Sequence, residues 1–112
     1  MTEYFTQSQV IAAIPGLSLP RLSSFLQADL VALQSVDNAP VFRAMDLARL
    51  ELLCELADHF DLDDDALGVV IGLIDQLHDT RRRLRAMAQA MEAEPQELRQ
   101  RVGARFVGIL AV

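Results

Sequence analysis

The apolar positions in the first quarter of the chain recur at helical spacing in two short runs. Residues 6–14, TQSQVIAAI, combine a capping box with an apolar face. The pair PG at 15–16 ends that pattern, and Ser18 is placed to cap a second helix with Pro20 in its first turn. The apolar positions of this second helix are Leu22, Phe25, Leu26 and Leu30. Two short helices joined by a tight turn are typical of a helix-turn-helix.

The next stretch loses helical spacing. Two short segments, VALQSV at 31–36 and VFR at 41–43, flank the turn sequence DNAP at 37–40. This pattern predicts a small hairpin, or wing.

Two further helices are predicted after the hairpin. Asp46 is expected to cap the first of them, which extends to about His59. Its predicted buried stripe consists of Leu50, Leu53, Ala57 and Phe60. Asp63 or Asp64 is expected to cap a long helix over 64–92, because carboxylates favour the positive N-terminal end of a helix.

Apolar residues of the long helix alternate at spacings of three and four, like the a and d positions of a coiled coil. They are Leu67, Val70, Ile74, Leu77, Leu84, Ala88 and Met91. Arg81 falls on the same seam, so either the helix turns towards solvent there or Arg81 fixes the register of a dimer interface. The candidate contacts of such a homodimer are Leu77, Arg81, Leu84, Ala88 and Met91.

The segment AEP at 93–95 breaks the long helix, because the residue before a proline avoids helical angles. A final helix follows, with Leu98, Val102, Phe106 and Ile109 on one side. Its apolar end is expected to fold back on the domain or to pack on a second subunit, and a disordered tail is the alternative. The predicted fold is mainly α: a winged helix-turn-helix and long helix over 1–92, then a helical tail over 93–112.

Composition places the chain among soluble proteins. Hydrophobic residues make up 52% of its 112 residues. The start of the chain lacks the pattern of a signal peptide, and its longest small apolar stretch, 66–74, is far too short to span a bilayer. Cys54 is the single cysteine, which excludes an internal disulfide and suits a core position. We therefore expect a cytoplasmic protein without a membrane partner.

The distribution of charge argues against DNA as the partner. Ten arginines and no lysine face sixteen acids, for a net charge of −6. Residues 47–65 contain one arginine against seven acids, whereas residues 66–112 are slightly basic. The presumed reading segment, 17–31, offers Arg21 as its one cation, with Ser23 and Ser24 beside it. Non-specific affinity for DNA comes mainly from Lys and Arg, so the presumed reading segment lacks most of that affinity.

No motif predicts an enzyme, a metal site or a cofactor. His59 and His78 lie nineteen residues apart without further ligands at suitable spacing, and there is no glycine-rich phosphate loop. The tract TRRRLR at 80–85 is compatible with a nucleic-acid or membrane patch. However, Asp79 lies four residues before Arg83, so a salt-bridged helix face is favoured.

A family resemblance accounts for the missing reading residues. The predicted helix-turn-helix and wing, followed by FRAMDLARL (42–50) and a long helix, resemble the MerR superfamily. Within it, DLDDDALGVVIGLIDQLHDTRRRLRAM (61–87) is similar to the CbpM-type chaperone modulators, through Leu73-Ile74-Asp75 and Leu84-Arg85. The opening segment of the chain that matches these modulators is FTQSQVIAAIPGLSLPRLSSFLQADLV (5–31). DNA-binding members carry an Arg-Tyr pair where this chain has Ser23 and Ser24.

The resemblance implies a protein partner, the J-domain of a CbpA- or DnaJ-type co-chaperone. Binding would inhibit the stimulation of the DnaK-type chaperone by that co-chaperone. J-domains present a basic helix, which an acidic surface can cover. The candidate J-domain-facing residues are Asp61, Leu62, Asp63, Asp64 and Asp65. Alternatively, these acids only cap the long helix and are solvated, and the protein is a dimeric MerR-like transcription regulator that binds DNA.

Overall fold

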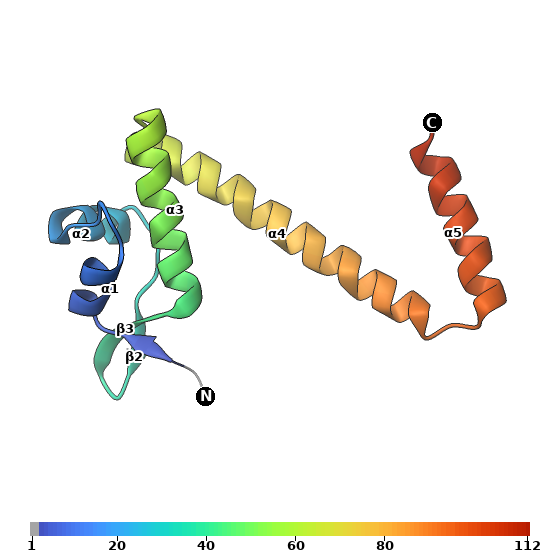
Figure 1. The fold of residues 1–112 in the computed structure, drawn as a ribbon, viewed down its shortest axis with the longest axis horizontal. Helices are drawn as coiled ribbons and strands as arrows, with labels where there is room; N and C mark the ends of the chain where they lie inside the picture. Colours follow the sequence, from blue (N-terminus) through green and yellow to red (C-terminus); the bar gives the residue numbers. More distant parts are fainter. Residues whose placement is uncertain (1–2) are drawn as a thin grey trace. The chain divides into compact units, whose positions relative to one another are not determined.

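The computed structural model describes residues 3–112 (Figure 1). Within that range the chain is mainly helical, with five helices and a small three-stranded antiparallel sheet, as predicted for its class. The elements are β1 (Tyr4–Phe5), α1 (Gln7–Ala13), α2 (Leu19–Gln27), β2 (Gln34–Val36), β3 (Ala39–Arg43), α3 (Ala44–Phe60), α4 (Asp64–Glu92) and α5 (Gln96–Leu110). Two compact units divide the chain, one ending at Leu73 and the other extending from Ile74 to Val112, so α4 contributes to both.

Side chains cap the first two helices as predicted. Thr6 Oγ1 accepts a hydrogen bond from the Gln9 amide at 3.2 Å, and Gln9 Oε1 accepts one from the Thr6 amide at 2.9 Å. Ser18 Oγ accepts from the Arg21 amide at 3.3 Å, and Pro20 lies in the first turn of α2, where a missing N–H costs nothing. Local sequence signals therefore fix where α1 and α2 begin.

The second helix ends earlier than its apolar spacing predicts. It stops at Gln27, and Asp29 adopts the left-handed conformation with φ of 57°. The Leu30 amide then donates back to the Phe25 carbonyl at 3.0 Å, which is the long bond of a Schellman motif. Leu30 is buried as predicted, but it lies beyond the helix and reaches the core through this turn.

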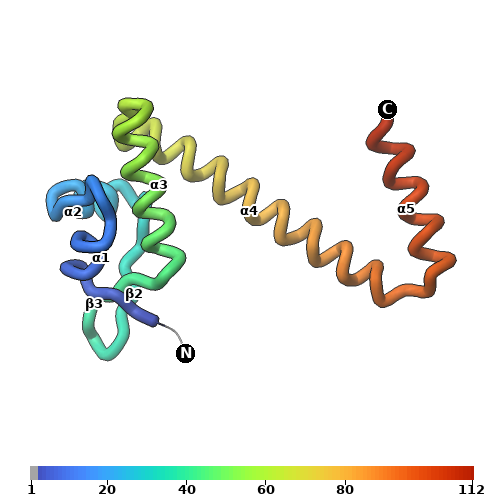
Figure 2. The backbone as a smooth tube through the Cα atoms, viewed as in Figure 1, coloured from blue at the N-terminus to red at the C-terminus, as the bar shows by residue number. Residues whose placement is uncertain are grey.

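The predicted hairpin is present, and a third strand joins it. Strands β2 and β3 pair from Gln34 opposite Val41 to Val36 opposite Ala39, and Figure 2 shows the tight reversal between them. The two turn residues, Asp37 and Asn38, have φ of 52° and 64°, as a type I′ turn requires. Strand β1, which the sequence did not predict, pairs with the other edge of β3.

Two predictions for α3 are wrong. Asp46 does not cap the helix, because α3 begins at Ala44 and Arg43 occupies the cap position. Asp46 instead lies inside the first turn, where its carboxylate accepts from the Arg43 amide at 2.8 Å. Phe60 is not buried but 68% exposed. At about 100° per residue it falls at the edge of the face that buries Leu50, and it is the last residue of the helix.

All the buried apolar side chains of residues 3–112 belong to the first unit. They are Val10, Ile14, Leu17, Leu22, Phe25, Leu30, Val31, Phe42, Leu50, Leu53, Cys54, Leu67 and Ile71. The first turns of α4 contribute Leu67 and Ile71, four residues apart, whereas the predicted seam residue Val70 is only half-buried. The core thus lies where α1, α2, α3 and the start of α4 converge.

No helix of residues 3–112 combines the length and the apolar character that crossing a membrane requires.

Candidate functional site

The acidic turn, defined here as Asp61, Leu62, Asp63, Asp64 and Asp65, joins α3 to α4. Asp61 ends α3 in the left-handed conformation, with φ of 53° and ψ of 42°. Asp tolerates this conformation better than most residues that have a side chain. The chain therefore reverses at Asp61, and the remaining acids fall on the N-terminal end of α4.

The carboxylate of Asp63 caps α4, as one of the two predicted alternatives has it. Its Oδ1 accepts a hydrogen bond from the Ala66 amide at 2.8 Å, and its carbonyl accepts from the Leu67 amide at 2.9 Å. Asp64 and Asp65 lie in the first turn, where the partial positive charge of the helix end favours carboxylates. Both the capping role and an exposed acidic surface are thus compatible with the same residues.

Asp64 has a partner that the sequence did not predict. Ser24 Oγ of α2 donates to Asp64 Oδ2 at 2.5 Å, in a part-buried position, 40 residues away along the chain. This hydrogen bond joins Ser24, the second residue of the Ser23-Ser24 pair in the presumed reading segment, to the start of α4. Asp64 therefore contributes to the packing of α4 against α2 through this hydrogen bond.

The other three acids of the turn face solvent. Asp61, Asp63 and Asp65 are exposed, while Leu62 is half-buried. Asp63, Asp64 and Asp65 line a shallow, open hollow in the surface. The turn thus presents carboxylates on an accessible surface of the first unit, and their oxygens are acceptors for cationic side chains.

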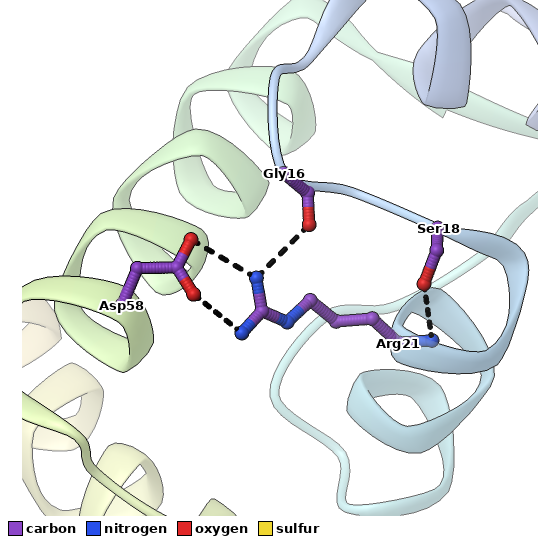
Figure 3. A network of polar contacts seen from close by, with 4 residues as sticks. All are labelled: Gly16, Ser18, Arg21 and Asp58. Carbon is purple, nitrogen blue, oxygen red and sulfur yellow. Dashed lines mark hydrogen bonds and ion pairs between the residues drawn. The ribbon is translucent and has the colours of Figure 1, made fainter.

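Arg21, the one cation of α2, is held inside the first unit (Figure 3). Its Nη2 lies 2.7 Å from Asp58 Oδ1 and its Nη1 lies 3.2 Å from Asp58 Oδ2, so the guanidinium donates two hydrogen bonds to the carboxylate. Nη1 also donates to the Gly16 carbonyl at 2.9 Å. The side chain of Arg21 is only 28% exposed. It therefore links α2 and the turn before it to α3.

The ion pair shifts the ionisation of both partners. Hydrogen bonds from Arg21 lower the pKa of the Asp58 carboxyl below its ordinary value. The same bonds raise the pKa of the Arg21 guanidinium. Burial raises the pKa of the Cys54 thiol, although the nearby guanidinium of Arg21 opposes that shift. Cys54 is 2% exposed and belongs to the core, as predicted.

These contacts change the distribution of uncompensated charge that the sequence predicted for the first unit. Asp58 is one of the seven acids of residues 47–65, but its charge is compensated by Arg21. Helix α1 has no charged residue, and α2 has only Arg21. In a helix-turn-helix, helices at these two positions would contact DNA. The one cation among the described residues of α1 and α2 is Arg21, and its charge is compensated by Asp58.

Apolar side chains lie on the surface near the acidic turn in the sequence. Phe60, immediately before the turn, is 68% exposed. Val69 and Leu73, four residues apart on α4, are 65% and 60% exposed. Two residues at this spacing share one helix face, so both can contact the same partner. Sequence reasoning missed Phe60 as a surface residue because its spacing matched a buried stripe.

Two arginines of the basic tract on α4 form salt bridges with Asp79, one of them the predicted pair with Arg83. Arg83 Nε lies 3.0 Å from Asp79 Oδ2 at the predicted spacing of four, and Arg82 Nη2 lies 2.5 Å from Asp79 Oδ1.

The candidate dimer residues of the second unit are on the surface. Leu77 and Leu84 are 48% and 53% exposed; Arg81 and Ala88 are exposed and Met91 is half-buried.

Comparisons of the chain with protein families, with curated proteins and with solved structures found no match.

Proposed function

We propose that this protein is a chaperone modulator of the CbpM type, which binds the J-domain of a CbpA- or DnaJ-type co-chaperone. Binding blocks the stimulation of the DnaK-type chaperone by occlusion. In this proposal the first unit is a MerR-like winged helix-turn-helix whose reading helix no longer reads DNA. The observation that carries it is the placement of Arg21, whose guanidinium is bonded to Asp58 and to the Gly16 carbonyl.

In this proposal the partner binds the acidic turn and the exposed Phe60 next to it in the sequence, a surface that is acidic and partly apolar. Asp61, Asp63 and Asp65 supply exposed carboxylates, and Phe60 supplies an exposed aromatic ring beside them in the sequence. Opposite charges speed the encounter with a basic helix and select the right partner, whereas buried aromatic side chains contribute much of the affinity. This combination supports a basic, amphipathic protein partner.

Calorimetric titration of the protein with a J-domain at two salt concentrations tests the proposal. The sharpest variant combines Asp61→Asn, Asp63→Asn and Asp65→Asn. Asn adopts the left-handed conformation of position 61 readily and caps a helix as well as Asp does. Three charges are therefore removed while the turn and the start of α4 keep their geometry. We expect the dissociation constant to rise about tenfold or more at low salt, and less at high salt.

A matched control removes three charges elsewhere. Asp37→Asn changes another exposed residue with positive φ, Glu97→Gln changes another first-turn acid, and Glu51→Gln changes an exposed acid of α3. This variant has the same net charge as the first, so unequal loss of binding locates the contact at the acidic turn. Equal loss would show only a long-range effect of net charge, and would contradict the assignment of the turn.

Phe60→Ala separates the two contributions. It should weaken binding at both salt concentrations, because the lost contact is apolar and is not screened. If the unmodified protein shows no heat of binding and no competition at high concentration, the J-domain is not its partner. Retardation of DNA fragments by the same protein would then favour a DNA-binding regulator.

A further inference from the structure

The start of α4 is apolar on every side, although the core covers only one of its sides. Residues 66–73, ALGVVIGL, span about two turns without a polar side chain. Helices that are apolar all round are normally buried. In the first unit, however, the buried residues of this segment are only Leu67 and Ile71. The opposite side therefore has apolar side chains where a surface helix has polar ones.

The exposed positions of this segment form one line along the helix, which we name the outer face. Between positions 64 and 73 they are Asp65, Val69 and Leu73, at intervals of four. Val69 and Leu73 are 65% and 60% exposed. At about 100° per residue, Val69 points roughly 160° away from both Leu67 and Ile71. The packing that buries Leu67 and Ile71 therefore leaves the outer face uncovered.

Asp65 gives the outer face one charged end. It follows Asp63 and Asp64 in the acidic turn, and Val69 and Leu73 come about one and two turns further along α4. A partner that matches this order has cationic side chains at one end and apolar side chains beyond them, as a basic amphipathic helix does. Opposite charges orient such a helix, and the apolar contact supplies affinity.

A second copy of this chain matches the outer face poorly. In a parallel pair Asp65 would lie opposite the Asp65 of the other copy, and in an antiparallel pair about Val69 it would lie against Leu73. The first arrangement brings like charges together, and the second buries a carboxylate against an apolar side chain.

An anionic bilayer also matches the outer face poorly. The first unit, which contains this face, has three arginines against eleven acids, so a negatively charged surface repels it. Among the three kinds of occupant, the charges favour a cationic protein partner.

We infer that the outer face of α4 receives a basic amphipathic helix of the partner. The cationic end of that helix lies over the acidic turn, and its apolar side chains lie on Val69 and Leu73. The inference rests on the proposed function for the identity of the partner, the J-domain. It adds Val69 and Leu73 to the acidic turn as contacts, and it fixes which end of the partner helix lies at the start of α4.

Calorimetric titration with the J-domain compares two double variants. Val69→Gln with Leu73→Gln makes the outer face polar, and Gln is a good helix former. The matched control is Met87→Gln with Val107→Gln, since these residues are 69% and 65% exposed in the second unit. The outer-face variant should raise the dissociation constant about tenfold or more at low and at high salt, because an apolar contact is not screened. The control should bind as the wild type does.

The heat capacity change of binding gives a second readout. Burial of apolar surface makes this change negative, so its magnitude should be smaller for the outer-face variant than for the wild type. If the wild type binds the J-domain and the outer-face variant binds it equally tightly, the inference is overturned while the proposed function stands.

A synthetic helical peptide of leucine and lysine tests the outer face without the J-domain. Its control peptide has serine in place of leucine and the same charge. Chemical-shift changes at the methyl groups of Val69 and Leu73 with the first peptide but not with the second would support the inference, even if the J-domain failed to bind and the proposed function were wrong. Equal changes with both peptides would overturn the inference. So would unchanged methyl shifts with both the leucine-lysine peptide and the J-domain.

Two further results would assign another occupant and would also overturn the inference. In sedimentation, loss of self-association by the outer-face variant but not by the control would place a second copy on the outer face. Loss of binding to phosphatidylcholine vesicles by the same variant would place lipid there.

Discussion

Arg21 of α2 and Asp58 of α3, 37 residues apart in the chain, are joined by two hydrogen bonds between guanidinium and carboxylate. The pair fixes the turn at Gly16 against α3, because the same guanidinium also binds the Gly16 carbonyl. It also removes the one cation of α2 from the solvent-facing charge of the first unit.

The contribution of this pair to stability should depend on pH. Arg21 lowers the pKa of folded Asp58, so the stabilisation is present above the ordinary carboxyl pKa and is lost as pH falls through the lowered value. The free-energy difference between wild type and Asp58→Asn should therefore be constant from about pH 5 to 8 and should shrink in acid. Urea unfolding over a pH series measures it. Glu51→Gln, which removes one charge from the same helix, is the control, and a difference that grew in acid would contradict the role of the pair.

Two glycines should respond to alanine in opposite ways. Gly16 has φ of +84°, and an added Cβ would lie 3.1 Å from Asp58 Oδ2, so Gly16→Ala should destabilise the protein by about 1–2 kcal/mol. Gly72 lies inside α4 with nothing within 4 Å of the added atom, so Gly72→Ala should stabilise it by up to about 1 kcal/mol. Chemical unfolding of both variants gives the signs, and a shared sign would show that backbone conformation is not the cause.

Phe42 and Phe60 offer a comparison between the core and the surface. Phe42 is 0% exposed, so Phe42→Ala should cost about 3–5 kcal/mol of unfolding free energy through the lost contacts and the cavity. Phe60 is 68% exposed, so Phe60→Ala should change that free energy by less than about 0.5 kcal/mol. Thermal and urea unfolding measure both. A large loss for Phe60→Ala would mean that the residue supports the fold, and its use as a binding variant would then be unsound.

The hydrogen bond between Ser24 and Asp64 should stabilise the junction between α2 and α4. Ser24→Ala leaves a part-buried carboxylate without this donor, which should cost about 1–3 kcal/mol of unfolding free energy. Ser23→Ala, the neighbouring substitution in the same helix, controls for the loss of a hydroxyl. Equal effects of the two substitutions in denaturant titrations would rule out a specific role of the bond.

Features encoded by neighbouring residues could be predicted from the sequence. The capping box at Thr6 and Gln9, the cap at Ser18 and the turn at Asp37-Asn38 each depend on residues within four positions of one another. The long helix was predicted over the residues that it occupies, since an acidic N-terminus and a proline break mark its two ends.

Features that join distant segments could not be predicted in this way. Strand β1 consists of two residues, Tyr4 and Phe5, and it exists through its pairing with Arg43 and Phe42 of β3. Likewise, the sequence showed the acids of the turn but not that Ser24 would bind one of them. For Phe60, the spacing fitted a buried stripe, but no residue pattern showed where the core ends along α3.

The absence of buried side chains in α5 has a consequence for amide hydrogen exchange. Protection from exchange follows local stability, and amides in the first unit can draw on the core around Leu22, Leu50 and Leu53. Amides of α5 have no such support within a single chain. They should therefore exchange faster than the amides of the core, although both groups lie in regular helices. The exchange pattern would then distinguish helices that tertiary packing stabilises from a helix that depends mainly on local interactions.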